Sequence, residues 1–223
     1  MVYCIGSSKP IKRKLIVVGD GACGKTSLLN VYTRGYFPQV YEPTVFDNYV
    51  NDVYIDGKHV ELSIWDTAGQ EEFDRIRSLS YSDTHVIMIC FSVDNKDSLE
   101  NIPNRWMEEL EEGCPRAKII LVALKCDLRE DETTLKKCDP ILYQEGLSVA
   151  KSIRAVRYLE CSAKHNRGVR ECFDQAAKVA ISAFLRYSIT FIVAFCMRIT
   201  TYTYIYNIHL YLILYSYLIV LVQ

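Results

Sequence analysis

The chain has 223 residues, of which 26 are Lys or Arg, 27 are Asp or Glu, and half are apolar. This length suits one domain of ordinary size plus a shorter extra segment, and it buries a sizeable core without disulfides. The near-zero net charge lacks the basic excess of a nucleic-acid-binding surface, so no nucleic-acid partner is predicted. The nine cysteines form no C-x-x-C pair and the four histidines lie far apart, which disfavours a zinc site and indicates reduced, cytosolic thiols.

The uneven distribution of charge divides the chain into three parts. Residues 1–11 contain no apolar stretch like that of a secretory signal and are expected to form a flexible segment. Residues 12–186 carry mixed charges throughout, as a globular domain does. Residues 187–223 contain no acidic residue and hold seven of the sixteen tyrosines, so this apolar tail needs a separate explanation.

The first predicted strand, Leu15–Val18, runs into a glycine-rich loop. In this loop the pattern G-x-x-x-x-G-K-[ST] is met by Gly19-Asp20-Gly21-Ala22-Cys23-Gly24-Lys25-Thr26, with Ser27 directly after it. A helix is predicted from Thr26 to Arg34, so backbone N–H groups can wrap an oxyanion at the helix start. Lys25 would reach the β- and γ-phosphates, and the Thr26 hydroxyl would ligate Mg²⁺. The loop thus predicts a nucleoside triphosphate of unspecified base; the alternative is a chance glycine turn.

A hairpin is predicted next, because Asp56-Gly57 separates Asn48–Ile55 from Lys58–Asp66. It would add one antiparallel edge strand to an otherwise parallel sheet. The second strand of the hairpin ends in Asp66-Thr67-Ala68-Gly69-Gln70. An aspartate here can hold Mg²⁺ through water, the Gly69 N–H can sense the γ-phosphate, and Gln70 can orient the attacking water. The alternative for Asp66 is a strand-end cap.

Two further apolar runs, Val86–Phe91 and Ile119–Leu124, are predicted to be strands covered on both faces. The second run leads into Lys125-Cys126-Asp127, at the carboxyl end of a strand, where α/β sheets bind ligands. The Asp127 carboxylate can accept two hydrogen bonds from the N1–H and N2–H₂ edge of guanine, which adenine lacks, while the Lys125 stem lies on the ring. Alone, K-x-D is more often a solvated loop, but together with the phosphate loop it predicts guanine.

The last predicted strand is Tyr158–Cys161, and it is followed by Ser162-Ala163-Lys164, which could offer a backbone N–H to guanine O6. The other helices are predicted at Ser98–Gly113, Tyr143–Ile153 and Val169–Leu185. The sequence therefore predicts an α/β fold of three layers, with a mostly parallel sheet of about six strands, one antiparallel edge strand and about five helices.

The region Lys12–Leu185 resembles the Rho family of small GTPases, a branch of the Ras-like GTPases with a P-loop GTPase fold. The resemblance is carried by a segment similar to the Rho switch I, Tyr41-Glu42-Pro43-Thr44-Val45-Phe46-Asp47-Asn48-Tyr49, by a segment similar to switch II, Asp66-Thr67-Ala68-Gly69-Gln70-Glu71-Glu72-Phe73-Asp74-Arg75, and by Tyr158-Leu159-Glu160-Cys161-Ser162-Ala163. Gly21-Ala22-Cys23 and Ala123-Leu124-Lys125-Cys126-Asp127 resemble a fungal Rho branch involved in polarised growth and exocytosis.

The resemblance implies a monomer that binds GTP and GDP with Mg²⁺. Thr44 would place a second hydroxyl on Mg²⁺ and a backbone N–H on the γ-phosphate. Phe37 would pack against the guanine, and Tyr41 would cover the phosphates. Gly21 would leave room for Gln70 and for an incoming arginine.

Catalysis is expected to rest on Gln70, Lys25 and Thr44. No arginine of the phosphate loop or switch I is placed to act in cis, so slow intrinsic hydrolysis is expected. The rival hypotheses are a nucleotide-bound, non-cycling scaffold made inactive by its tail, and a P-loop kinase or ATPase, against which Asp127 argues.

The implied partners are Rho-type exchange factors, GTPase-activating proteins and effectors that bind the GTP state through switch I (Tyr41–Tyr49) and switch II (Ala68–Tyr81). A membrane is also expected, with the protein on the cytoplasmic side of the plasma membrane and in the cytosol. The processes implied by the resemblance are actin organisation, cell polarity and vesicle exocytosis.

The sequence departs from the Rho pattern at two internal places. Leu124 stands where most relatives have Asn or Thr, so a hydrogen bond between this strand end and the phosphate loop is expected to be missing and nucleotide exchange to be faster. Arg129–Leu142 is shorter than the usual Rho insert. Cys23 is expected to be a packing residue, with a redox-sensitive thiol as the alternative.

The C-terminal segment differs most from the Rho pattern. It ends Leu218-Ile219-Val220-Leu221-Val222-Gln223, with no C-a-a-X prenylation box. One hypothesis is a tail anchor, since Ile205–Val222 carries no formal charge over a length that just spans a bilayer. The favoured hypothesis is translated noncoding sequence, because Tyr, Ile, Leu and Thr dominate. Cys4, near the other end, is either a free thiol or an acylation site.

Overall fold

The computed structural model describes residues 9–40 and 42–182. The predictions for Cys4, Tyr41 and the tail at 187–223 lie outside the described residues, as do most of the predicted flexible segment and the end of the predicted domain at residue 186. Among the described residues, no helix combines the length and the apolar character needed to cross a bilayer.

Six strands form one sheet, in the order β2-β3-β1-β4-β5-β6. All neighbouring pairs are parallel except β2 and β3, which are antiparallel. The mostly parallel sheet with one antiparallel edge strand is therefore confirmed. Its strands are β1 (Ile11–Val18), β2 (Phe46–Ile55), β3 (Lys58–Thr67), β4 (Val86–Ser92), β5 (Lys118–Leu124) and β6 (Arg157–Glu160).

Burial explains the character of each strand. All seven residues of the central strand β4 are buried, as expected for a strand with helices on both faces. The edge strand β2 instead alternates between exposed and half-buried residues along most of its length. The predicted hairpin turn is present, because Asp56 and Gly57 both have positive φ angles, 49° and 74°, as a two-residue turn of this type requires.

Apart from 3₁₀ turns, six helices occur in residues 9–40 and 42–182 when the continuous run Lys96–Gly113 is counted once, and about five were predicted. Four of them match helices that were placed in the sequence; the other two are α2 and the single-turn α5, which lies inside the segment 129–142. The segments are α1 (Lys25–Arg34), α2 (Asp74–Ser78), α3 (Lys96–Asn101) continued by a π-helical turn (Ile102–Trp106) and α4 (Met107–Gly113), α5 (Glu132–Leu135), α6 (Tyr143–Ser152) and a last helix at 169–182.

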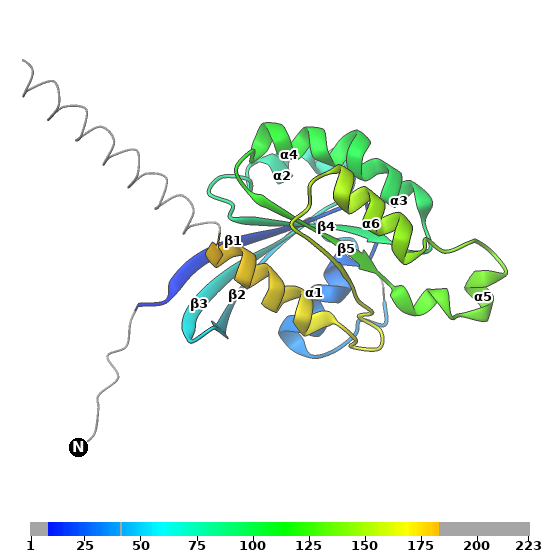
Figure 1. Ribbon diagram of the computed structural model, residues 1–223, viewed down its shortest axis with the longest axis horizontal. Helices are drawn as coiled ribbons and strands as arrows, with labels where there is room; N and C mark the ends of the chain where they lie inside the picture. Colours follow the sequence, from blue (N-terminus) through cyan, green and yellow to red (C-terminus); the bar gives the residue numbers. More distant parts are fainter. Residues whose placement is uncertain (1–8, 41, 183–223) are drawn as a thin grey trace, which may run out of the picture. The chain divides into compact units, whose positions relative to one another are not determined.

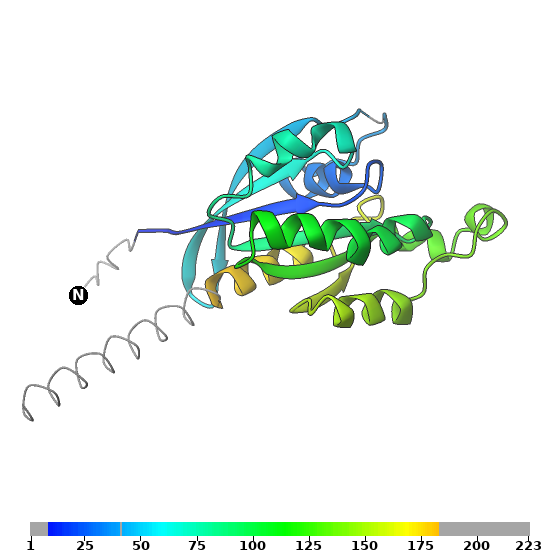
Figure 2. The ribbon, with the colours of Figure 1, turned by 90° about the horizontal axis from the view of Figure 1, so that it is seen from above.

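The sheet separates two hydrophobic cores, which makes three layers (Figures 1 and 2). On one face, α1 and the last described helix pack on the sheet through residues such as Leu28 and Phe173. On the other face, the run α3–α4 and the helix α6 pack through residues such as Trp106 and Ala150. Both cores reach the carboxyl ends of β1 and β5, so the loops at this edge of the sheet are held from both sides.

Candidate functional site

The glycine-rich loop between β1 and α1 adopts a conformation that few side chains allow. Gly19 and Gly24 have φ angles of 136° and 107°, in the region that favours glycine. A Cβ atom on Gly19 would lie 2.1 Å from the carbonyl oxygen of Cys90 in β4. The glycines therefore let the loop pass close to the neighbouring strand before α1 begins at Lys25.

The side chain of Lys25 is buried within this loop. Its Nζ donates hydrogen bonds to the carbonyl oxygens of Gly19 (2.7 Å) and Asp20 (2.8 Å). The side chain remains 5% exposed. The ammonium group is thus held against the backbone of the phosphate loop. Lys25 is also the first residue of α1, so the positive end of the helix dipole lies at the same place.

Three oxygen-bearing side chains meet beside the loop. Thr26 Oγ1 donates to Asp66 Oδ2 at 2.7 Å and lies 2.5 Å from Thr44 Oγ1. Asp66 is fully buried at the end of β3, and its second oxygen, Oδ1, has no hydrogen-bond partner in the described part of the chain. Burial raises the pKa of Asp66 to about 6, against the opposing effects of the Thr26 hydroxyl and the Lys25 ammonium. All three residues were predicted from the sequence as ligands of this site.

Two adjoining cavities lie at this edge of the sheet, and they share Gly24, Ser27, Phe37 and Lys125 in their walls. The larger cavity has a volume of about 760 Å³ and is lined by the phosphate loop and both predicted switch segments. The smaller has a volume of about 130 Å³ and is lined by Gly24, Ser27, Phe37, Leu124, Lys125, Asp127, Leu128, Ala163 and Lys164. One cleft therefore brings together segments that are more than 100 residues apart in the sequence.

The smaller cavity contains the residues predicted to recognise a base. Asp127 Oδ1 is buried and has no hydrogen-bond partner among residues 9–40 and 42–182. Lys125 Nζ lies 3.6 Å from Asp94 Oδ1, an ion pair that the sequence did not indicate. Ala163 and Lys164 line this cavity, whereas Ser162 does not. The Ser162 N–H donates to the Arg167 carbonyl at 2.9 Å and is therefore already engaged. Of the three backbone N–H groups in Ser162-Ala163-Lys164, those of Ala163 and Lys164 therefore remain as the candidate donors to a base.

Gly69 and Gln70 lie against the phosphate loop. A Cβ atom on Gly69 would lie 2.3 Å from the Gly19 carbonyl oxygen, so only glycine fits where β3 ends. A Cβ atom on Gly21 would lie 3.5 Å from Gln70 Cδ, at ordinary van der Waals contact. Gly21 and Gln70 thus lie side by side, but a Cβ atom at Gly21 would not clash with Gln70 here, so the expectation that glycine is needed to leave room stays a prediction. Gly21, Ala22, Thr44, Gly69 and Gln70 all line the larger cavity.

Two residues of the phosphate loop turn away from the cavities. The Asp20 carboxylate accepts hydrogen bonds from Asn101 Nδ2 at 2.7 Å and from Trp106 Nε1 at 2.8 Å. Cys23 is buried, and burial raises the pKa of its thiol in spite of the nearby Lys25 ammonium. The thiol is therefore held in its protonated form, which agrees with the packing role and not with the redox-sensitive alternative.

Sequence reasoning missed Asn30. This residue of α1 is buried, its Oδ1 has no partner in the described part of the protein, and it lines the larger cavity. The available signal was its position between the apolar residues Leu29 and Val31, where a polar side chain is unexpected.

The sheet order, the loop conformation and the divided cleft together define the class of P-loop GTPases. The sequence model of the Ras protein family matches residues 14–182 of the chain. The chain is 63% identical over 185 residues to GTP-binding protein rho3 of Schizosaccharomyces pombe, with 82% of this chain and 90% of that protein covered. It is 56% identical over 203 residues to GTP-binding protein RHO3 of Saccharomyces cerevisiae (79% and 88% covered), and 54% identical over 176 residues to GTP-binding protein rho1 of S. pombe (77% and 87%). The chain therefore belongs to the Ras family of small GTPases, enzymes that hydrolyse GTP to GDP, and within it to the fungal Rho proteins.

The Leu124 side chain gives a first testable prediction. It is 2% exposed and belongs to the same hydrophobic cluster as Cys23, so the strand end packs against the phosphate loop through apolar side chains. Leu124→Asn introduces a hydrogen-bonding amide next to this loop and is expected to slow GDP release by about 3- to 10-fold, the range of one net hydrogen bond. Release of a fluorescent GDP analogue measures this rate. Leu135→Asn, at an exposed position of α5, is the control; equal or faster release from Leu124→Asn would contradict the prediction.

Proposed function

We propose that this chain is a Mg²⁺-dependent GTP switch of the Rho type. The observation that carries the proposal is the contact among Thr26, Thr44 and Asp66. These residues come from α1, from the segment before β2 and from the end of β3, so a ligand bound between them would hold the phosphate loop and both switch segments together. Loss of that ligand would release two surface segments at once.

The residues of this cluster fit Mg²⁺. The cation prefers oxygen ligands, and the cluster supplies two hydroxyl groups and a carboxylate. Asp66 Oδ1, buried and without a partner among the described residues, supports the assignment, because a buried carboxylate oxygen is costly without a cation or donor. Thr26 and Thr44 would hold the ion directly, and Asp66 would hold it through water. When bound, Mg²⁺ offsets the negative charge of the β- and γ-phosphates.

The remaining residues of the two cavities are assigned to the reaction and to binding of the base. Lys25 places its positive charge at the β- and γ-phosphates, in the loop that its Nζ already contacts. Gln70 orients the attacking water, a role supported by its position next to Gly21 and by its place in the cavity wall. Gly69 and Thr44 supply backbone N–H groups to the γ-phosphate. The Phe37 ring, Lys125, Asp127 and the segment Ala163–Lys164 bind the guanine.

Partner binding is proposed at the two switch segments. Apolar side chains that a monomer would normally bury are exposed there, with Leu79 81% and Val45 48% exposed. These surfaces would bind effectors in the GTP state, as well as Rho-type exchange factors and GTPase-activating proteins. An arginine from an activating protein would accelerate hydrolysis by about 10³–10⁵, the range seen for related GTPases.

Thr26→Asn tests the Mg²⁺ assignment. The variant removes the hydroxyl shared by Asp66 and Thr44, and its affinity for GTP with Mg²⁺ is expected to fall by about tenfold or more relative to its affinity for GDP. Competition binding with and without Mg²⁺ measures both. Thr133→Asn, on the exposed α5, is the control. If the affinities for GTP and GDP fall by the same factor, and both respond to Mg²⁺ as in the parent, the assignment is wrong.

The cellular role proposed for this switch is the control of actin organisation, cell polarity and vesicle exocytosis, on the cytoplasmic side of the plasma membrane and in the cytosol. Support comes from the identity to relatives that carry the name Rho3, since the sequence resembles the fungal branch involved in polarised growth. The test is to follow the tagged full chain in growing cells. Enrichment of the Gln70→Leu variant at sites of growth, relative to Thr26→Asn, is expected; a uniform distribution of both would contradict the proposal.

A further inference from the structure

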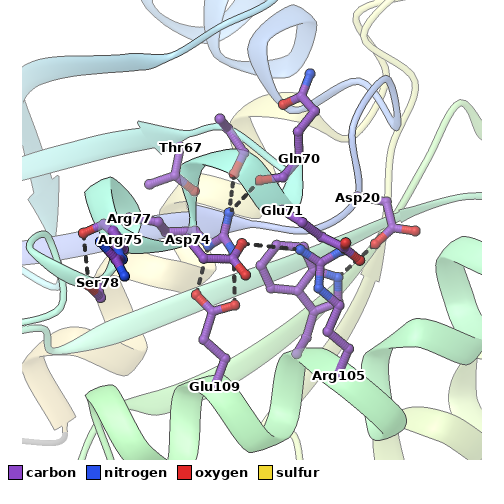
Figure 3. A network of polar contacts seen from close by, with 12 residues as sticks. Asp20, Thr67, Gln70, Glu71, Asp74, Arg75, Arg77, Ser78, Arg105 and Glu109 are labelled. Atoms are coloured by element: carbon purple, nitrogen blue, oxygen red, sulfur yellow. Dashed lines mark hydrogen bonds and ion pairs between the residues drawn. The ribbon is translucent and has the colours of Figure 1, made fainter.

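Arg77 of α2 is a buried cation in the switch II segment. Its side chain is 1% exposed, and Figure 3 shows it surrounded by Gln70, Asp74 and Glu109. Nε and Nη2 donate to the two carboxylate oxygens of Glu109 at 2.7 and 2.8 Å, a bidentate pairing with α4. Nη2 also donates to Asp74 Oδ1 at 2.5 Å. The guanidinium group is thus fixed in one orientation by two carboxylates.

The remaining nitrogen of this group, Nη1, contacts the backbone that precedes α2. It donates to the Ala68 carbonyl oxygen at 2.6 Å and lies 3.5 Å from the Gln70 carbonyl oxygen. The Ala68 carbonyl belongs to the same peptide unit as the Gly69 N–H. Because the peptide is planar and trans, fixing its oxygen toward Arg77 directs the Gly69 N–H to the opposite side. Arg77 therefore sets the direction of the N–H group assigned above to the γ-phosphate.

The same group of residues reaches the phosphate loop through Trp106. The Arg77 guanidinium lies 4.7 Å from the centroid of the Trp106 ring, within the range of a cation–π contact. Trp106 Nε1 donates to Asp20 Oδ1 at 2.8 Å, and Asp20 belongs to the phosphate loop. Arg105 lies 4.9 Å from the same ring. The buried side chains Arg77 and Trp106, together with the half-buried Glu109 and Asp20, connect switch II, α4 and the phosphate loop; we call these four residues the Arg77 cluster.

We propose that Arg77 is a positioning residue for GTP hydrolysis: held by Glu109 and Trp106, it orients the Ala68–Gly69 peptide and the backbone of Gln70 toward the γ-phosphate, in fixed relation to the phosphate loop. This inference rests on the proposed function, because it takes Gly69 and Gln70 as the groups that meet the γ-phosphate. Arg77 itself touches neither nucleotide nor water in this scheme; it acts through the two carbonyl oxygens that it binds.

Two variants test the inference through different partners. Arg77→Lys keeps the charge but cannot contact both Glu109 oxygens and the Ala68 carbonyl together, since a lysine presents one nitrogen. Glu109→Gln keeps the size of the side chain and removes the charge that holds Arg77, so the inference stays testable if either variant alone fails to fold. The matched control is Arg170→Lys, because Arg170 is an exposed arginine whose ion pair with Asp174 lies on the last described helix.

Each folded variant is measured for three quantities: single-turnover GTP hydrolysis at saturating nucleotide with Mg²⁺, affinity for GDP, and affinity for a non-hydrolysable GTP analogue. Arg77→Lys and Glu109→Gln are expected to hydrolyse GTP about tenfold more slowly and to lose affinity for the GTP analogue, with GDP affinity within about twofold of the parent. Arg170→Lys is expected to match the parent in all three.

A purely structural role for Arg77 would have a different outcome. It would lower the thermal unfolding temperature and weaken GDP and GTP analogue equally, without a separate loss in the hydrolysis rate; that result, or an unchanged hydrolysis rate in the folded variants, overturns the inference. Failure of the proposed function is distinguishable, since the parent chain itself would then show no Mg²⁺-dependent preference between GTP and GDP or no hydrolysis.

Discussion

Gln70→Leu is expected to abolish hydrolysis stimulated by a Rho-directed activating protein, a loss of about 10³–10⁵ in rate. Leucine has nearly the size of glutamine but lacks the amide that orients the attacking water. The substitution should not disturb packing, because Gln70 is only half-buried and even a Cβ atom added at Gly21 would lie at ordinary van der Waals distance from it. The GTP-bound form would therefore accumulate.

Single-turnover hydrolysis with and without the activating protein measures this effect, and GTP affinity within about twofold of the parent shows that binding is intact. Gln144→Leu, at an exposed position of α6, controls for the substitution itself. Stimulated hydrolysis at the parental rate in Gln70→Leu would remove Gln70 from the mechanism.

Asp127→Asn is expected to lower GTP affinity by about 10²- to 10⁴-fold, from the loss of two hydrogen bonds to a charged acceptor. The buried Asp127 Oδ1 has no other partner in the described residues, so the chain offers nothing to replace the guanine. The asparagine amide can donate to O2 of xanthine, which stands where guanine carries its amino group. The variant should therefore bind xanthosine triphosphate more tightly than GTP.

Competition of both triphosphates against a fluorescent nucleotide measures this change of preference. Asp139→Asn removes a carboxylate from an exposed ion pair with Lys96 and is the control. If the Asp127→Asn variant still binds GTP more tightly than xanthosine triphosphate, Asp127 does not recognise the base.

Much of the fold could be predicted because the strands are buried on both faces. β4 and β5 were found as apolar runs to within one residue at each end. β1 was predicted to begin at Leu15 but begins at Ile11. Its first half carries Lys12, Arg13 and Lys14, whose polar side chains break the apolar run even though their backbone pairs with β3. In this half of β1, the pairing of the backbone could therefore not be predicted from the pattern of side chains.

The candidate site was predictable where function depends on local spacing. The glycine loop, Thr26 and Asp66 follow from a strand end and a motif, and the structure brings them together. The Arg77–Glu109 and Asp20–Trp106 contacts were not predicted, because each joins residues more than 30 positions apart in separate elements. Such pairs depend on how helices pack on the sheet, which a single sequence does not reveal.

The order of the sheet also has a consequence for the time at which this fold can form during synthesis. β1 lies at the centre of the sheet, between β3 and β4, and is the first strand to leave the ribosome. β4 is complete only about 70 residues later, which corresponds to about 4–14 s at ordinary elongation rates. During that interval the segment Leu15–Val18, which is fully buried in the finished protein, has no strand on that side. The nascent chain is therefore a candidate for chaperone binding at this segment, before any nucleotide can stabilise it.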